Sequence, residues 1–182
     1  PDQALGVLFA NAVEYLDEIQ RRGYMPLVRS ARGCGGVSFR ASINIIEEAC
    51  KMRAARLMWS QLLVERYNIT DPKVRNLRIH CVTAGSKMTY QQPLNNIVRG
   101  TAMALGAILG GVQSMGVSGY DEALSIPSEH AHQMSVRIQQ ILQEETGITD
   151  VTDPLGGSFY VETLTAQLVD KAWTFFEDIQ QQ

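Results

Sequence analysis

Polar side chains gather around one apolar run of the sequence. Residues 77–83 alternate between apolar and polar positions, which places Arg78 and His80 on the same face of a strand, opposite its apolar side chains. The segment 83–93 that follows is rich in hydroxyl and amide groups and long for a strand–helix loop, and such loops tend to be functional. We therefore expect Arg78 and His80 to face a cleft or a barrel interior. A hydrogen-bonded core histidine is the alternative interpretation of His80.

Two later segments carry groups that could contact a ligand. Gln113 and Glu122 are the polar residues of interest in and after the run 111–117. A solvated carboxylate at a helix start is the alternative interpretation of Glu122. The stretch 153–158, Asp-Pro-Leu-Gly-Gly-Ser, is either a backbone nest for an anion or a tight turn.

Several other kinds of site are excluded by pattern. The sequence has no Gly-x-x-x-x-Gly-Lys phosphate loop, no His-Glu-x-x-His zinc motif and no Gly-x-Ser-x-Gly nucleophile elbow. His130 and His132 cannot share a helix face and are predicted to lie on the surface. The three cysteines, Cys34, Cys50 and Cys81, match no zinc pattern and are predicted to be reduced thiols, which favours the cytoplasm or an organelle matrix.

Composition and charge limit the partners. The chain has 182 residues, 45% hydrophobic and 19% charged, as a globular protein does. Its net charge of −3 argues against nucleic acid, and its longest apolar run, 101–113, is interrupted by glycines, which argues against a membrane span. The chain begins at Pro1 without a signal pattern, so we expect it to be cut from a longer protein.

Regularly spaced elements must position these groups. Apolar runs predict four strands, and each run is followed by a helical pattern, as strand–helix–strand crossovers require. The pattern predicts a parallel α/β fold, either a small doubly wound domain or half of a (β/α)₈ barrel. The strands are predicted at 36–39, 77–83, 111–117 and 149–152, and the helices at 3–20, 42–67, 93–109, 128–146 and 163–180.

The helix ends and one charged residue add detail. Gly23 and Gly147 are predicted to end helices, and Ser128 to cap one. Arg53 falls in the apolar stripe of the helix at 42–67. It either extends its guanidinium from a packed helix to solvent or forms a buried ion pair that holds two helices in register.

Seven short segments resemble, in order and spacing, the adenosylcobalamin-dependent acyl-CoA mutases, the family that includes methylmalonyl-CoA mutase. The resemblance runs from about residue 44 to residue 165. The segments are Lys-Met-Arg-Ala-Ala-Arg-Leu-Met-Trp at 51–59, Leu-Arg-Ile-His-Cys at 77–81, Gln-Gln-Pro-Leu-Asn-Asn-Ile-Val-Arg at 91–99, Gly-Gly-Val-Gln-Ser at 110–114, Asp-Glu-Ala-Leu at 121–124, Gln-Glu-Glu-Thr-Gly at 143–147 and Asp-Pro-Leu-Gly-Gly-Ser at 153–158.

The resemblance implies an α/β fold in which parallel (β/α) units form the C-terminal half of a TIM (β/α)₈ barrel. Residues 1–182 would be a partial acyl-CoA-binding barrel domain with about strands 5–8. In this family the barrel encloses the acyl-CoA, and a cobalamin-binding domain covers the carboxyl ends of the strands. That domain is expected outside this chain, either in the same protein or in another subunit, and it is expected to supply the cobalt ligand. The cobalt-ligating histidine of the family has Asp two residues before it, and no histidine here does.

The resemblance also assigns roles to residues. Glu122 is implied to accept hydrogen bonds from the ribose hydroxyls of adenosylcobalamin. No metal ligand is implied here, and the catalytic residues are unknown because the family's catalytic Tyr and His lie in the N-terminal half. The implied cofactor-binding residues are Gly85, Glu122 and Ser125, and the implied substrate-binding residues are His80, Gln113, Ser118, Arg32 and Ser38, the last two through a segment whose length differs by about two residues.

The chain departs from the family at its acyl pocket. Val82 replaces a usual Gln, and Met-Gly-Val-Ser at 115–118 replaces a usual Leu-His-Thr-Asn run. Polar or bulky pocket groups have thus become small or apolar. We therefore expect an acyl group that is bulkier or less polar than methylmalonyl.

The resemblance implies an isomerase, part of a mutase that rearranges the carbon skeleton of an acyl-CoA by radical chemistry and is inactive as the isolated chain. Its expected partners are the acyl-CoA, the N-terminal half-barrel, the cobalamin-binding domain or subunit, and a second copy of itself. The alternative is a degenerate half-barrel that serves as an assembly or interaction module. A stand-alone doubly wound ligand-binding domain is a third, weaker interpretation.

Overall fold

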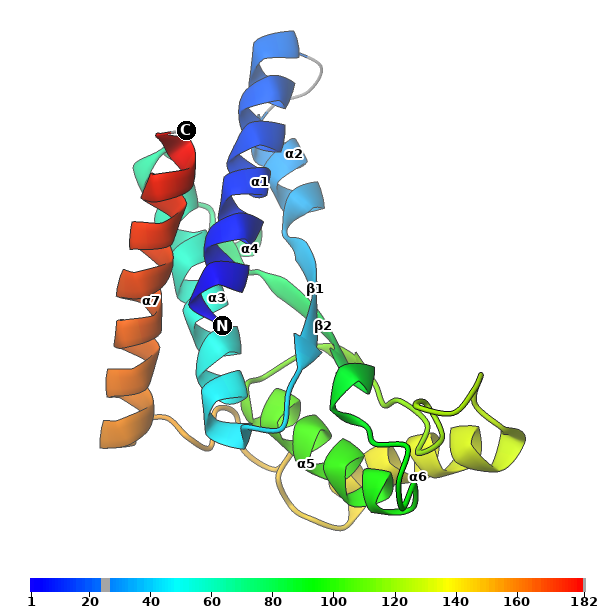
Figure 1. Ribbon diagram of the computed structural model, residues 1–182. Helices are drawn as coiled ribbons and strands as arrows, with labels where there is room; N and C mark the ends of the chain where they lie inside the picture. The colour runs from blue at the N-terminus through cyan, green and yellow to red at the C-terminus, as the bar shows by residue number, and fades with distance from the viewer. Residues whose placement is uncertain (24–26, 182) are drawn as a thin grey trace. The chain divides into compact units, whose positions relative to one another are not determined.

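The computed structural model describes residues 1–23 and 27–181 (Figure 1). The chain divides into two compact units. Unit 1 contains Pro1–Val37, Cys50–Arg78 and Phe159–Gln182, and unit 2 contains Ser38–Ala49 and Ile79–Ser158. Within the described ranges, no helix is both long and apolar enough to cross a membrane.

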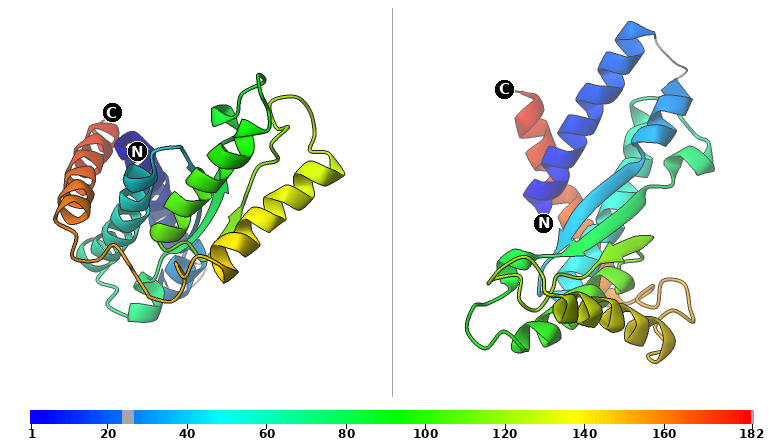
Figure 2. Two further views of the ribbon diagram at one scale, coloured as in Figure 1. Left: turned by 90° about the horizontal axis from the view of Figure 1, so that it is seen from below. Right: turned by 90° about the vertical axis from the view of Figure 1, so that its right-hand side faces the viewer.

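Unit 1 is built mainly from helices. Two of them, α1 (Asp2–Arg22) and α7 (Phe159–Gln180), lie side by side (Figures 1 and 2). They pack closely because Gly6 of α1 has no side chain: a Cβ there would lie 3.1 Å from the Ala172 carbonyl oxygen of α7. The other helices of this unit are α2 (Leu27–Cys34), α4 (Pro72–Arg75) and the part of α3 (Ile45–Glu65) from Cys50 onward.

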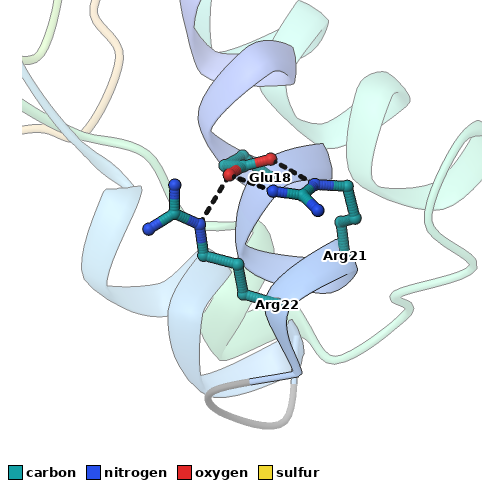
Figure 3. Close-up of polar contacts among 3 residues, drawn as sticks. All are labelled: Glu18, Arg21 and Arg22. Carbon is teal, nitrogen blue, oxygen red and sulfur yellow. Dashed lines mark hydrogen bonds and ion pairs between the residues drawn. The ribbon is translucent and has the colours of Figure 1, made fainter.

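The first helix ends as its sequence predicts. Gly23 adopts the left-handed conformation, with φ 64°, and its N–H donates to the carbonyl oxygens of Ile19 and Gln20. In the last turns, Glu18 accepts hydrogen bonds from Arg21 and Arg22 (Figure 3). These bonds lower the pKa of Glu18 to about 2. The cluster is exposed, so we regard it as a solvated helix end rather than a site.

The core of unit 1 settles the role of Arg53. Its side chain is only 13% exposed, and its Nη2 lies 2.7 Å from Oε1 of Glu162 on α7. The predicted ion pair between two helices is confirmed, but it is not buried throughout, because Glu162 is 48% exposed. The buried apolar residues of unit 1 include Leu5, Phe9, Val13, Met52, Met58, Trp59, Leu63 and Leu168.

Most of the sheet lies in unit 2. The strand order is β1 (Gly36–Ala41), β2 (Arg78–Thr83), β3 (Ser114–Gly116). Strands β2 and β3 are parallel, with His80 opposite Ser114 and Val82 opposite Gly116. Backbone bonds from Arg78 to Gly35 and from Ala84 to Ala41 make β1 parallel to β2 as well. The predicted parallel α/β class is confirmed.

Helices α5 (Asn95–Leu109) and α6 (Glu129–Glu144) pack against each other in unit 2. A short 3₁₀ helix, η1 (Gly85–Lys87), follows β2. Buried Ala104, Ile138 and Leu142 pack with Met115 and Val117 of the β3 segment. This apolar cluster covers the helix-facing side of β3 and leaves Ser114 and Gly116 to the other face.

The fourth predicted strand is wrong. Residues 149–152 form turns and bends. The Asp150 N–H, which a strand would pair, donates to the Gly147 carbonyl oxygen in a local turn. The Thr149 hydroxyl donates to the Gln143 carbonyl oxygen and so also bonds locally. Val151 is exposed and gives the segment no apolar face.

The helix predictions hold with shifted ends. Ser128 caps α6 by accepting a hydrogen bond from the Ala131 N–H. Helix α5 begins at Asn95, two residues after Pro93, and α7 begins at Phe159, earlier than predicted. The short helices α2 and α4 were not predicted, because neither is long enough for a periodic apolar pattern.

Candidate functional site

The loops that follow β2 and β3 meet at Gly85 and Glu122. Gly85 opens η1 just after β2, and Glu122 lies in the loop between β3 and α6. A Cβ added to Gly85 would lie 2.8 Å from Glu122 Oε1 and 2.9 Å from its Cγ, so the carboxylate side chain rests on glycine backbone. Glu122 is otherwise exposed. Two of the three residues predicted to bind the cofactor are thus in contact at the carboxyl end of the sheet.

Asp121 fixes the loop that carries Glu122. Its side chain is 7% exposed, and its Oδ2 accepts a hydrogen bond of 2.9 Å from the Ser128 N–H. This bond lowers the pKa of Asp121. The Asp121 carbonyl oxygen accepts from the N–H groups of Leu124 and Ser125. The loop is therefore tied to the start of α6, and the position of Glu122 follows from it.

Ser125 lies in the same loop, but none of the described contacts joins it to Gly85 or Glu122. Its hydroxyl is exposed and donates to the Ile126 carbonyl oxygen at 3.0 Å. Ser118, predicted to bind substrate, lies at the start of this loop. Its N–H donates to Thr83 Oγ1 and its hydroxyl to the Thr83 carbonyl oxygen, so it joins the ends of β2 and β3.

The alternation predicted for β2 is confirmed, and it defines an open face of the sheet. Ile79 and Cys81 are buried, whereas His80 is exposed. His80 Nδ1 lies 2.8 Å from Ser114 Oγ. Farther along the same face, a Cβ at Gly116 would lie 3.7 Å from Val82. A polar His–Ser pair and a small, apolar Val–Gly pair thus share one surface.

Gln113 has a different environment from His80. Its Oε1 accepts from the Ile79 N–H at 2.6 Å, and its Nε2 donates to the Gly111 carbonyl oxygen. The side-chain amide therefore takes the place of a backbone group at the edge of the β2–β3 pairing. Gln113 also lines a groove of about 400 Å³ with residues of α5, β3 and α6, including Ile108, Met115 and Gln139.

A cationic pocket lies in unit 1 near the first residue of β2. It has a volume of about 240 Å³ and is lined by Arg32, Lys73, Asn76 and Arg78. Three cations and an amide suit an anion such as a phosphate. Arg32 was predicted to bind substrate; Lys73 and Asn76 were not singled out, because they lie in and after the short helix α4. Ser38 is exposed on β1 and is not among the residues that line this pocket.

Asn96 is the residue of this region that sequence reasoning missed. It is 1% exposed, and its amide bonds to the loop after β2 and to the loop after β3. Its signal was an asparagine within the first turn of a predicted helix, where a side chain can bond to loop backbone.

The remaining candidates have ordinary structural roles. His130 is exposed, as predicted, and its Nδ1 lies 3.2 Å from the Tyr120 hydroxyl. Residues 153–158 form successive turns, with the Gly156 N–H donating to the Asp153 carbonyl oxygen. Cys50 and Cys81 are buried, and Cys50 Sγ lies 3.6 Å from the Val161 carbonyl oxygen; the side chain of Cys34 lies outside the described residues. Among the described residues, no group of three His, Cys, Asp or Glu side chains could hold a metal ion.

Comparison with known proteins identifies the family. The family described as methylmalonyl-CoA mutase matches residues 1–182. The chain is 39% identical over 180 residues to the 2-hydroxyisobutanoyl-CoA mutase large subunit of Aquincola tertiaricarbonis, which covers 99% of this chain and 32% of that protein. It is 40% identical over 178 residues to the methylmalonyl-CoA mutase of Cereibacter sphaeroides, covering 98% of this chain and 25% of that protein.

These relatives are larger proteins. The chain spans about a third of the first and a quarter of the second. A third relative, the methylmalonyl-CoA mutase of Escherichia coli, is 39% identical over 141 residues, which cover 78% of this chain and 20% of that protein. The match over the whole chain, together with the parallel sheet and the loops at its carboxyl end, shows that this chain belongs to the methylmalonyl-CoA mutase family.

Proposed function

We propose that this chain is part of an adenosylcobalamin-dependent acyl-CoA mutase, an isomerase that rearranges the carbon skeleton of an acyl-CoA. The contact between Gly85 and Glu122 is the observation that carries the cofactor assignment. It supports the proposal because it leaves an exposed carboxylate and side-chain-free backbone together at the carboxyl end of a parallel sheet, where such folds bind ligands.

The residues at this position fit the adenosyl group. Glu122 would accept hydrogen bonds from two ribose hydroxyls, and Gly85 keeps a side chain from displacing that carboxylate. Asp121 and Ser128 would hold the loop in register during binding. When bound, adenosylcobalamin supplies the radical chemistry that starts the rearrangement. The cobalt ligand would come from another domain or subunit.

The open face of the sheet would contact the acyl group. His80, paired with Ser114, would offer a polar contact, whereas Val82 and Gly116 would offer a small apolar surface. This combination favours an acyl group that is less polar or bulkier than methylmalonyl. Ser118 and Gln113 would act mainly by holding β2 and β3 in register, since their polar groups bond to strand backbone.

The cationic pocket would bind the phosphates of coenzyme A. Arg32 and Arg78 supply guanidinium groups, which match phosphate oxygens two at a time, and Lys73 adds a third charge. Ser38 would bind substrate, and only its place on β1 supports this role. Ser125 would bind the cofactor, and only its place in the loop after β3 supports this role.

Substitution of Glu122 in the complete protein tests the cofactor assignment. Two charge-assisted hydrogen bonds, each worth roughly 1.5–3 kcal/mol, would be lost in Glu122→Ala, so adenosylcobalamin should bind at least about 10-fold more weakly. Hydroxocobalamin lacks the adenosyl group, with its ribose, and should bind as before. Both affinities can be measured by titration with each corrinoid.

A matched control separates this effect from a general loss of charge. Glu129 is also exposed and is the first residue of α6, so Glu129→Ala should leave both affinities unchanged. If Glu122→Ala weakens both corrinoids equally, or neither, then Glu122 is a solvated carboxylate and the assignment fails.

A further inference from the structure

We propose that Asn96 is a positioning residue that locks the loop carrying Gly85 to the loop carrying Glu122, and that the affinity for the adenosyl group depends on this lock. The inference rests on the proposed function. It concerns a residue that would touch neither substrate nor cofactor, since Asn96 is 1% exposed on α5. It would act only by fixing the positions of Gly85 and Glu122.

The amide of Asn96 uses its full hydrogen-bonding capacity. Nδ2 donates to the Thr89 carbonyl oxygen and to the Tyr120 carbonyl oxygen, each at 2.8 Å. Oδ1 accepts from the Thr89 N–H at 3.0 Å and from Arg99 Nη1 at 2.9 Å. Two donors and two lone pairs are therefore all satisfied in a buried position. Neither a carboxylate nor an apolar side chain reproduces this set.

Three of these four bonds reach the two loops at points close to the site, and the fourth comes from Arg99 on the same helix. Thr89 lies four residues after Gly85, and Tyr120 lies two residues before Glu122. Arg99 adds a bond to Thr89 Oγ1 and so holds the first loop from the same helix. Because both loops are fixed to one amide, removing its donors allows the Gly85 backbone and the Glu122 carboxylate to shift independently.

Loosening the two loops is expected to misalign Glu122 with the adenosyl group and so to lower the affinity for adenosylcobalamin. If the Glu122 carboxylate shifts, its charge-assisted hydrogen bonds to the ribose are weakened or lost, so adenosylcobalamin binding should weaken by about 10-fold. Hydroxocobalamin, which makes no contact with Glu122, should bind within about 2-fold of the wild type. A general loss of folding would reduce both affinities alike.

The test uses the complete protein and two changes at Asn96. Asn96→Ala removes all four bonds, whereas Asn96→Asp keeps the acceptor and replaces the donors to Thr89 and Tyr120 with a second carboxylate oxygen, which faces their carbonyl oxygens. Both should show the selective loss for adenosylcobalamin. The matched control is Asn95→Ala, because Asn95 is exposed and its amide donates only to Gln92 among the described contacts; it should bind both corrinoids normally.

A double substitution shows whether Asn96 acts through Glu122. In the Glu122→Ala background, adding Asn96→Ala should cost no more than about a further 2-fold in adenosylcobalamin affinity, because coupled residues are not additive. A full 10-fold further loss, or an equal loss for both corrinoids, would overturn the inference. If Glu122→Ala itself lacks corrinoid selectivity, the proposed function fails separately.

A measurement without ligand tests the lock directly. Hydrogen exchange should speed up in both loops, 84–92 and 118–127, in Asn96→Ala and in Asn96→Asp, while exchange in α6 beyond its first turn remains unchanged. Faster exchange in one loop only, or in neither, would overturn the inference, whatever the corrinoid affinities show.

Discussion

Glu122 and Gly85 are in contact, and the contact depends on the absence of a side chain at residue 85. The carboxylate can rest on the loop after β2 only because residue 85 has no Cβ, and the space that a Cβ would take is filled by Glu122 Oε1 and Cγ. Gly85 is not required for its backbone conformation, because its φ is not positive. Its function is therefore steric.

The first prediction follows from that contact. Gly85→Ala should force Glu122 away and weaken adenosylcobalamin binding by at least about 10-fold, comparable to the loss of its hydrogen bonds. Gly33→Ala is the matched control, because a Cβ at Gly33 meets no atom within 4 Å. Equilibrium titration of both variants in the complete protein provides the measurement; normal binding by Gly85→Ala would refute the steric role.

The second prediction concerns pH. The Ser128 N–H bond lowers the pKa of Asp121 below its ordinary value of 3.8, so the ionised carboxylate stabilises the folded state. That stabilisation should be complete above pH 3.8 and should disappear as pH falls through the lower, folded-state pKa. Asp121→Asn keeps an acceptor oxygen but does not titrate.

Urea unfolding of the wild type and of Asp121→Asn at several pH values checks this dependence. The wild type should be the more stable protein near neutral pH, and the difference should shrink below pH 3.8. A difference that stays constant down to pH 3 would show that the bond does not depend on ionisation.

For single residues, the sequence predicted the loop or strand face on which a side chain lies, but not its hydrogen bonds to distant segments. It placed Glu122 and His80 on the correct loops and faces, because alternation and loop position are local properties. It missed Asn96 because the partners of that side chain, Thr89 and Tyr120, belong to loops whose meeting is a tertiary event. The hydrogen bond from the Ile79 N–H to the Gln113 side chain was not predicted for the same reason.

Among the helices, the pairing of α1 with α7 depends on Gly6. A Cβ there would lie 2.7 Å from Phe175 Cδ1, 3.1 Å from the Ala172 carbonyl oxygen and 3.2 Å from the Phe176 nitrogen. Two of these atoms belong to backbone and cannot move without shifting α7. The close approach of the two helices therefore needs glycine at this position.

The third prediction follows. Gly6→Ala should destabilise the complete protein, since overpacking costs about 1–3 kcal/mol and exceeds the gain of up to about 1 kcal/mol in helix propensity. Gly33→Ala, in α2, has open space and should be neutral or slightly stabilising. Denaturant unfolding distinguishes the two, and a stabilised Gly6→Ala variant would contradict the packing argument.

Elements with a long apolar period were predicted well, and short ones were not. The ranges 3–20 and 128–146 match α1 and α6 closely, because 3.6-residue periodicity and end residues such as Gly23 and Ser128 are encoded locally. The strand expected at 149–152 failed because four residues of mixed polarity give no periodic signal, and turn bonds then decided the conformation.

Taken whole, the chain has a three-stranded sheet whose outer strands, β1 and β3, each pair only with β2 in the described part. Unpaired strand edges invite association. The fourth prediction is that the isolated chain 1–182 self-associates at micromolar concentration, and that supplying the rest of the barrel suppresses this. Sedimentation velocity is the measurement; a monomer that unfolds cooperatively would contradict it.

If this chain belongs to an adenosylcobalamin-dependent mutase, the complete protein should isomerise an acyl-CoA, and an assay of that reaction decides the assignment. Methylmalonyl-CoA and 2-hydroxyisobutanoyl-CoA should be assayed with adenosylcobalamin, with hydroxocobalamin and without corrinoid. We expect isomerisation of an acyl-CoA only with adenosylcobalamin, and none by the isolated chain 1–182. Isomerisation without adenosylcobalamin would contradict the assignment, as would a complete protein that binds adenosylcobalamin yet isomerises neither these two substrates nor any bulkier or less polar acyl-CoA that it binds.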